Sequence, residues 1–190
     1  MTIKLSTLFA ALALALAGNA WAVTQAEYNA QKAAISSQYK AAKASCDSLK
    51  ANARDVCLTE ARGVEKIGRA EAESAYNPSA RNTENLAMTK AEATYDTAVE
   101  KCDDLSGNAK DVCVKDAKAA QVKATNDAKV SSNSSNNTTG RPDILAGGKR
   151  TGITEERQAN YQAANERCDT LSGNIREACQ RDAKVRYGMN

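Results

Sequence analysis

The fold of this chain is decided by the stretch Tyr95-Asp-Thr-Ala-Val-Glu-Lys-Cys102-Asp-Asp-Leu-Ser-Gly-Asn-Ala-Lys-Asp-Val-Cys113. Its apolar positions Tyr95, Ala98, Cys102 and Leu105 are spaced by three, four and three residues, which is the period of one face of an α-helix. A Ser-Gly-Asn sequence follows, and a second helical stripe begins at Cys113. The stretch therefore predicts two helices joined by a short turn.

The same pattern occurs twice more without gaps, beginning at Tyr39 and at Tyr161. Every copy has Tyr, then Ala at the third position after it, Cys at the seventh, Asp at the eighth, Leu at the tenth, Asn at the thirteenth and Cys at the eighteenth. Internal repetition of this kind indicates several copies of one supersecondary unit. We therefore predict an all-α fold of three antiparallel helical hairpins.

Each predicted hairpin carries two cysteines that are equidistant from its turn, so they face each other across it. The next facing pair outward is Ala opposite Ala in every copy, which lets the backbones approach to the Cα separation of about 4.4–6.8 Å that a disulfide needs. The other connectivities of six cysteines stay open on the sequence alone. The geometry favours local pairs, each stabilising its hairpin by about 3 kcal/mol: Cys46–Cys57, Cys102–Cys113 and Cys168–Cys179.

The centre of the turn differs between the copies. Gly107 and Gly173 suit the left-handed residue that ends a first helix, and the Asn that follows each glycine suits the N-cap of the second helix. The first copy reads Lys50-Ala51-Asn52 and has no glycine. We expect its turn to differ in shape or to be strained.

Charged and aromatic residues also recur at fixed positions. The Asp after each first Cys is followed seven positions later by a basic residue, which predicts an exposed ion pair across the turn, worth about 0–1 kcal/mol. These pairs are Asp47–Arg54, Asp103–Lys110 and Asp169–Arg176. We interpret the repeated Tyr as a packing residue over the outer end of the disulfide seam rather than as a ligand contact.

The first residues have the features of a secretory signal peptide. Lys4 precedes an apolar run over Leu8–Ala17, and Ala20-Trp21-Ala22 has the small-x-small pattern of a cleavage site. The run is too short to span a bilayer, which needs about 20 residues. We expect Val23 to be the mature N-terminus, no transmembrane segment after cleavage, and a periplasmic location, where cysteines form disulfides.

Composition and turn residues divide the rest of the chain. A Ser/Asn-rich segment around Ser131–Thr139 is typical of a flexible linker. We expect hairpins one and two to stack through their long helices, and hairpin three to be tethered rather than docked. The predicted organisation is a signal peptide over 1–22, hairpin one over 23–77, hairpin two over 78–130, a linker over 131–153 and hairpin three over 154–190.

The residue types present argue against catalysis. The chain has no His, which removes the commonest general base and most zinc, copper and haem sites. It has no Cys-x-x-Cys motif for thioredoxin-type chemistry, and acidic and basic residues are interleaved without a basic cluster for nucleic acid. We predict no catalytic residue, no cofactor, no metal site and no nucleic-acid partner.

The repeated unit Tyr-x6-Cys-Asp-x-Leu-x2-Asn-x4-Cys, flanked by Ala/Lys-rich helices, resembles exported proteins of proteobacteria that are described as cell-envelope-biogenesis or TolA-like. The resemblance implies a cell-envelope location and transfers no functional residue. This chain differs from TolA in its cleavable signal, where TolA keeps a membrane anchor.

The function expected from the sequence is that of a non-catalytic periplasmic helical repeat protein, acting as a structural or protein-binding module. Its partner would be an unknown protein or envelope component. Two alternatives stay open: a periplasmic stress chaperone that exposes its Ala/Val seam, and a thiol–disulfide redox sensor. The redox alternative requires a labile disulfide, for which Cys46–Cys57 is the first candidate because its turn lacks glycine.

Overall fold

The computed structural model describes residues 23–136 and 142–189, and within these ranges the side chains outside 133–151. The signal peptide predicted over 1–22 lies outside the described residues. The described chain is helical almost throughout, which confirms the predicted all-α fold of hairpins. Its helices are α1 (Gln25–Cys46), α2 (Ala51–Tyr76), α3 (Ala80–Cys102), α4 (Gly107–Asn136), α5 (Pro142–Cys168) and α6 (Gly173–Tyr187).

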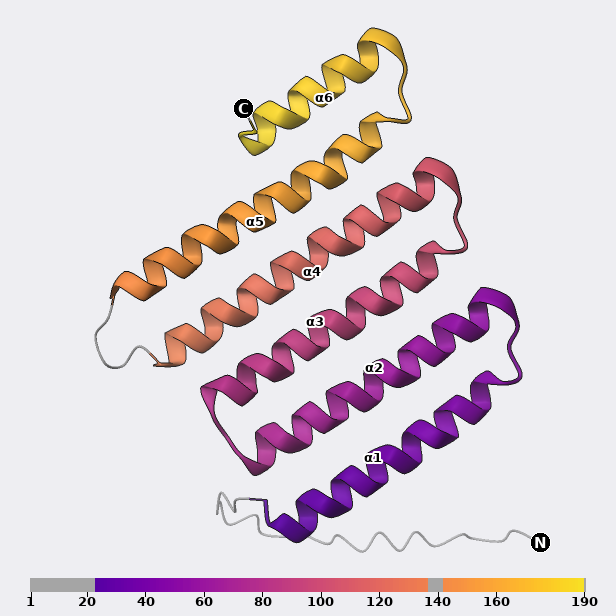
Figure 1. Ribbon diagram of the computed structural model, residues 1–190, viewed down its shortest axis with the longest axis vertical. Coiled ribbons are helices and arrows are strands. Elements are labelled where there is room, and N and C mark those ends of the chain that lie inside the picture. Colours follow the sequence, from indigo (N-terminus) through magenta and orange to yellow (C-terminus); the bar gives the residue numbers. More distant parts are fainter. Residues whose placement is uncertain (1–22, 137–141, 190) are drawn as a thin grey trace, which may run out of the picture.

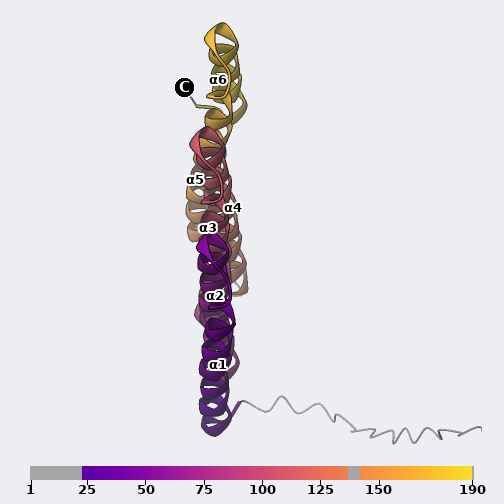
Figure 2. The same ribbon diagram turned by 90° about the vertical axis from the view of Figure 1, so that its right-hand side faces the viewer.

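The helices lie side by side in chain order and form a single flat layer. Each described helix packs only against its neighbours in the sequence, and the view along the layer confirms that it is one helix thick (Figure 2). The turns α1–α2, α3–α4 and α5–α6 lie along one edge of this layer, and the α2–α3 connection lies at the opposite edge (Figure 1). Both broad faces of the layer are therefore open to solvent.

Local sequence explains where several helices begin and end. Thr24 and Glu27 form a capping box at the start of α1, with the Thr24 hydroxyl accepting from the Glu27 backbone N–H at 3.2 Å. Ser79 caps α3 by accepting from the Asn82 backbone N–H at 3.1 Å. Gly188, with φ of 62°, ends α6 in the left-handed conformation that glycine favours.

The core of the layer is built from small residues. Every buried apolar side chain among the described residues is Ala or Cys, and the most deeply buried are Cys46, Cys102 and Cys168. Alanine seams let helices approach closely but bury little apolar area, which limits hydrophobic stabilisation. The disulfides therefore matter more here than they do in a domain with a large core.

Hairpin one is closed at both ends of its seam. The Cys46–Cys57 disulfide joins α1 to α2 at the turn. Further along, Ile35 packs against Gly68, where an added Cβ would lie 3.3 Å from the Ile35 side chain. At the open end, the rings of Tyr28 and Tyr76 stack with centroids 4.6 Å apart.

The hairpins pack against one another through equally small residues. Between α2 and α3, Gly63 lies so close to Ala93 that an added Cβ would meet the Ala93 Cβ at 3.1 Å. Between α4 and α5, Ala119, Ala159 and Ala163 form a buried cluster. Ion pairs bridge α2 and α3 at the surface, namely Lys66–Glu92, Lys90–Glu71 and Lys101–Glu60, each at 2.8 Å.

The expectation that hairpin three is tethered rather than docked is wrong. Besides the alanine cluster, the buried Asn126 side chain of α4 donates from Nδ2 to the Gly152 carbonyl of α5 at 2.7 Å. Docking is possible because Gly152 leaves room for Asn126: a Cβ at this glycine would lie 3.1 Å from the Asn126 side chain.

The linker predicted over 131–153 falls partly outside the described residues. α4 continues to Asn136, and α5 begins at Pro142. In the described part of the chain, no helix is long and apolar enough to cross a membrane.

Candidate functional site

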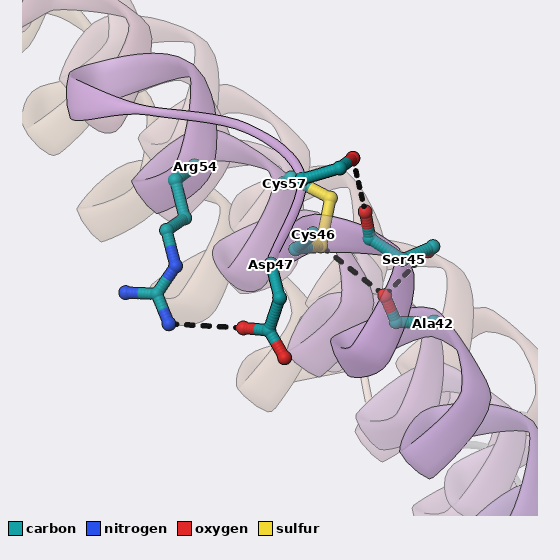
Figure 3. The surroundings of a disulfide bond; sticks show 7 residues. Ala42, Ser45, Cys46, Asp47, Arg54 and Cys57 are labelled. Atoms are coloured by element: carbon teal, nitrogen blue, oxygen red, sulfur yellow. Dashed lines mark hydrogen bonds and ion pairs between the residues drawn. A yellow bond between two sulfur atoms is a disulfide. The ribbon is translucent and has the colours of Figure 1, made fainter.

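The three disulfide turns are the most distinctive feature of the described chain. Each disulfide joins cysteines eleven positions apart with a Cα–Cα distance of 5.7 Å, and no described cysteine is free. In the first turn the Cys46–Cys57 bond lies at the end of α1, beside the Asp47–Arg54 ion pair (Figure 3). The predicted local pairing is confirmed: Cys46–Cys57, Cys102–Cys113 and Cys168–Cys179.

The first helix of each hairpin ends earlier than predicted. α3 stops at Cys102, and its C-cap Asp103 keeps right-handed dihedrals. The Leu105 N–H then donates to the Cys102 carbonyl at 2.9 Å, so a tight turn follows the helix. The prediction that Gly107 ends the first helix is therefore wrong; its left-handed φ of 57° lies where the chain enters α4.

The turn of hairpin one is strained, as predicted. Ala51 occupies the position of Gly107 and Gly173 and has φ of 50°, the one positive φ of a non-glycine residue in the described chain. An L-residue in this region costs about 1–2 kcal/mol because its Cβ approaches the backbone. The cysteine separation is nevertheless the same in all three turns, so the hairpin geometry is imposed on Ala51.

The repeated Asn does not cap the second helix. α2 and α6 begin one residue before their Asn, and the residues at their N-cap positions make no side-chain capping bond. Asn108 instead donates from Nδ2 to the Glu166 carbonyl of α5 at 3.0 Å. Asn108 thus connects α4 to α5 through a carbonyl that also accepts from the Asp169 N–H at 3.1 Å, whereas the buried Asn52 Nδ2 has no hydrogen-bond partner.

Two of the three predicted ion pairs are present. Asp47 pairs with Arg54 at 3.0 Å, and Asp103 pairs with Lys110 at 2.9 Å. The hydrogen bond to the Asp103 carboxylate raises the pKa of Lys110 above its usual value. The third pair is absent.

In the third turn the expected partners bind elsewhere. Arg176 donates from Nε to the Leu171 carbonyl at 2.7 Å, and Asp169 accepts from Gln180 Nε2 at 3.1 Å. A basic residue near the turn has two acceptors within reach, and the spacing alone does not choose between the carboxylate and the carbonyl.

The repeated leucine lies in the turn and not on the helix face where periodicity placed it. Leu49, Leu105 and Leu171 are 40%, 44% and 37% exposed. Leu171 lines a groove together with Cys168 and Cys179, so its side chain lies beside the disulfide. Since the three turns share one edge (Figure 1), this edge presents the same half-exposed leucine three times.

Tyrosines contribute packing and one polar contact that the sequence did not reveal. Tyr39 lines the groove between α1 and α2, which agrees with its interpretation as a packing residue. The Tyr28 hydroxyl donates to Glu73 Oε2 at 2.6 Å, and this hydrogen bond raises the pKa of Tyr28. The stack with Tyr76 was missed because neither residue belongs to the repeated motif.

Two open grooves run along hairpin seams. The larger, of about 680 Å³, lies between α1 and α2 and is lined mainly by apolar side chains, among them Ile35, Val64 and Ile67. Val64 is 67% exposed there. A second groove, of about 530 Å³, lies between α5 and α6 and includes Leu171 and Ile175.

Chemically, the arrangement offers rigid surfaces. In residues 23–132 and 152–189, no cluster of metal-ligating side chains is present. Each turn holds a cysteine pair and a half-exposed leucine, and the first two turns also hold an ion pair. Searches of family models, of curated proteins and of solved structures return no match to this chain.

Proposed function

We propose that this chain is an exported, non-catalytic module of the bacterial cell envelope, which acts in the periplasm as a structural or protein-binding element. The observation that carries the proposal is the row of three disulfide-locked turns along one edge, each with a half-exposed leucine. A rigid array that repeats one exposed group suits extended contact with a partner.

Two features support the location. All six cysteines are paired, which is typical of proteins in an oxidising compartment outside the cytoplasm. The sequence pattern of residues 1–22 and the resemblance to exported envelope proteins both favour the periplasm.

In-cell photo-crosslinking tests the binding role. A photo-crosslinking amino acid replaces Leu105 at the turn edge, and a matched variant carries it at Arg62, an exposed residue in the middle of α2. We expect a discrete adduct with another polypeptide from the Leu105 position and not from Arg62. Recovery of the chain without any adduct at both positions would contradict the proposal.

A chaperone role is the first alternative, and the groove between α1 and α2 favours it. Val64 is 67% exposed within an apolar lining, which offers a surface for an unfolded client. This function requires that the protein delay aggregation of a model client at equimolar ratio and that Val64→Lys abolish the delay. Aggregation at the rate of the client alone would exclude it.

A redox-sensing role is the second alternative, and the strained Ala51 favours it. Strain in the closed hairpin weakens the Cys46–Cys57 bond relative to the reduced state. Trapping with an alkylating agent in cells would then find these two thiols partly reduced while the other four stay oxidised. Complete oxidation under reducing stress would remove this alternative.

A further inference from the structure

The two interfaces between neighbouring hairpins share an ion pair and a small-residue contact, while the Asn108–Glu166 hydrogen bond of α4·α5 has no equivalent in α2·α3, where Asn52 Nδ2 has no partner. An acidic residue three positions after the second Cys pairs with a basic residue immediately before the first Cys of the next hairpin. These pairs are Glu60–Lys101, at 2.8 Å, and Asp116–Arg167. A contact between small residues also recurs. In the first interface Gly63, six positions after Cys57, packs against Ala93, nine positions before Cys102. Ala119 and Ala159 occupy the same positions in the next interface.

α6 carries the part of the docking face that lies nearest the turn, while the position of Val122 in α4 falls on Gly188, after the end of α6. Asn174, Asp182 and Val185 occupy the positions of Asn108, Asp116 and Ala119, and all three are exposed, Val185 at 82%. The charged residues around this face of α6 do not prevent docking, because α4, which does dock a helix, has charges of the same sign at the equivalent positions. These equivalents are Glu177 and Asp111, Arg181 and Lys115, and Lys184 and Lys118.

α1 presents the opposite half of the same interface. Its face away from α2 carries Ala30, Ser37 and Ala41, which are exposed and occupy the positions of Gly152, Ala159 and Ala163. In α5, Ala159 and Ala163 pack on Ala119 of α4. α1 and α6 lie at the two ends of the layer, so both halves are accessible at once (Figure 1).

We propose that α6 of one copy docks on α1 of a second copy, in the antiparallel register that α2·α3 and α4·α5 already use. The inference deepens the proposed structural function, on which it rests, by naming a second copy of this chain as the partner. The reason is continuity: the same kind of interface joins α2 to α3 and α4 to α5. In the described chain, α6 carries one half of such an interface and α1 carries the other, and neither half has a partner helix.

The register specifies the contacts. Val185 lies over Ser37 and Ala41 of the second copy, where small side chains leave room for it. Asn174 donates to the Ala44 carbonyl, as Asn108 donates to the Glu166 carbonyl. Lys40 of the second copy reaches the C-terminal end of α6, whose free carbonyls favour a cation.

The contact is weaker than the two internal interfaces. In the internal interfaces Lys101 and Arg167 supply the cation of the ion pair. Ser45 occupies the equivalent position in α1, so Asp182 would face a hydroxyl group instead of a cation. A single helix pair also buries less than the roughly 1,200–2,000 Å² of a stable protein–protein interface. The association is therefore reversible and concentration-dependent, and it propagates because it is head-to-tail.

Engineered cysteines test the register. Ser37→Cys and Val185→Cys variants are oxidised separately and as a mixture at high micromolar concentration, with peptide mapping to verify the native disulfides. We expect crosslinked dimers from the mixture, monomers from each variant alone, and a ladder of oligomers from the double variant. Dimers of Ser37→Cys alone would indicate a two-fold α1–α1 contact and overturn the proposal, as would monomers throughout.

A matched control and a measurement without engineered cysteines complete the test. Arg62→Cys, on a broad face, should not crosslink with Ser37→Cys. In sedimentation, the average mass of the wild-type protein should rise with concentration, and that of Val185→Asp should not; an unchanged wild-type mass would contradict the proposal. An in-cell adduct of Leu105 with another protein, without self-association, would overturn self-docking and leave the binding function intact.

Discussion

Hairpins one and two are closed by disulfides with the same Cα–Cα distance of 5.7 Å, yet they enter their second helices through different residues. Gly107 adopts φ of 57° without steric cost, whereas Ala51 is held at 50°. The cysteine pair and the antiparallel register therefore fix the turn, and the residue at the left-handed position adopts a positive φ whether or not it is glycine.

The open ends of the two hairpins differ as well. Hairpin one stacks Tyr28 on Tyr76. Glu84 and Ser132 hold the equivalent repeat positions in hairpin two, where the buried Ser132 hydroxyl donates to Glu84 at 2.8 Å. Hairpin one thus combines a strained turn with an aromatic clamp, and hairpin two combines a relaxed turn with a single hydrogen bond.

Removing a disulfide should give the largest effect and separate the two hairpins. We expect Cys102→Ala/Cys113→Ala to lower the free energy of unfolding by about 3 kcal/mol, because the unfolded chain regains the entropy of the closed loop. Cys46→Ala/Cys57→Ala should cost about 1 kcal/mol less, since the strain at Ala51 can then relax. Guanidinium unfolding followed by circular dichroism measures both, and a larger loss in hairpin one would contradict the comparison.

Removing the side-chain contacts at the open ends of the two hairpins should give the next largest loss of stability. Tyr76→Ala removes a stacked aromatic pair and should cost about 1–2 kcal/mol. Ser132→Ala removes one hydrogen bond and should cost about 1 kcal/mol. The same unfolding experiment ranks the two, and Tyr76→Phe, which keeps the ring, serves as the control that should retain most of the stability. Equal losses for Tyr76→Ala and Tyr76→Phe would show that stacking is not the stabilising contact.

Exchanging the turn residues isolates the strain itself. Gly107→Ala should destabilise by about 1 kcal/mol through its positive φ alone, because no atom lies within 4 Å of an added Cβ. Ala51→Gly should stabilise by a similar amount. The control is Ala53→Gly, at an exposed helical position of α2, which should destabilise by about 0.5–1 kcal/mol. Stabilisation by both glycine substitutions, or by neither, would refute the assignment of strain to Ala51.

The smallest effect concerns Tyr28. Its hydrogen bond to Glu73 raises its pKa in the folded protein, so the neutral form is favoured. Its contribution to stability is therefore present below the unfolded pKa of about 10 and is lost as the pH rises through the raised folded value. An ultraviolet titration should show one tyrosine ionising later than the others, and Tyr28→Phe should remove that late step. A late step that persists in Tyr28→Phe would assign it to another residue.

The repeat predicted what depends on short-range geometry. Cysteines equidistant from the turn gave the three disulfide pairs, and the missing glycine at Ala51 gave the strained turn. The helix end at Cys102 was missed because Leu105 continues the helical period in sequence while its N–H closes a tight turn in space. Periodicity reports which residues share a face and not whether the helix continues through all of them.

Contacts between hairpins were harder to predict. Asn108 suited an N-cap from its place after a glycine, but the carbonyl that it binds belongs to Glu166, far along the chain. The docking of α5 on α4 depends on the complementary volumes of Asn126 and Gly152, which are not a recognisable apolar pattern. The recurrence of Asn in all three units does not reveal this contact, because Asn52 Nδ2 in the first unit has no hydrogen-bond partner.

Peptide mapping without reduction tests the central claim, that each hairpin is closed by its own disulfide, most directly. Trypsin cleaves between the two cysteines of every pair, at Lys50 and Arg54, at Lys110 and at Arg176, so each pair yields a distinct linked peptide. We expect the linkages Cys46–Cys57, Cys102–Cys113 and Cys168–Cys179 in protein trapped with an alkylating agent. A free thiol in any hairpin, or a linkage between cysteines of different hairpins, would contradict it.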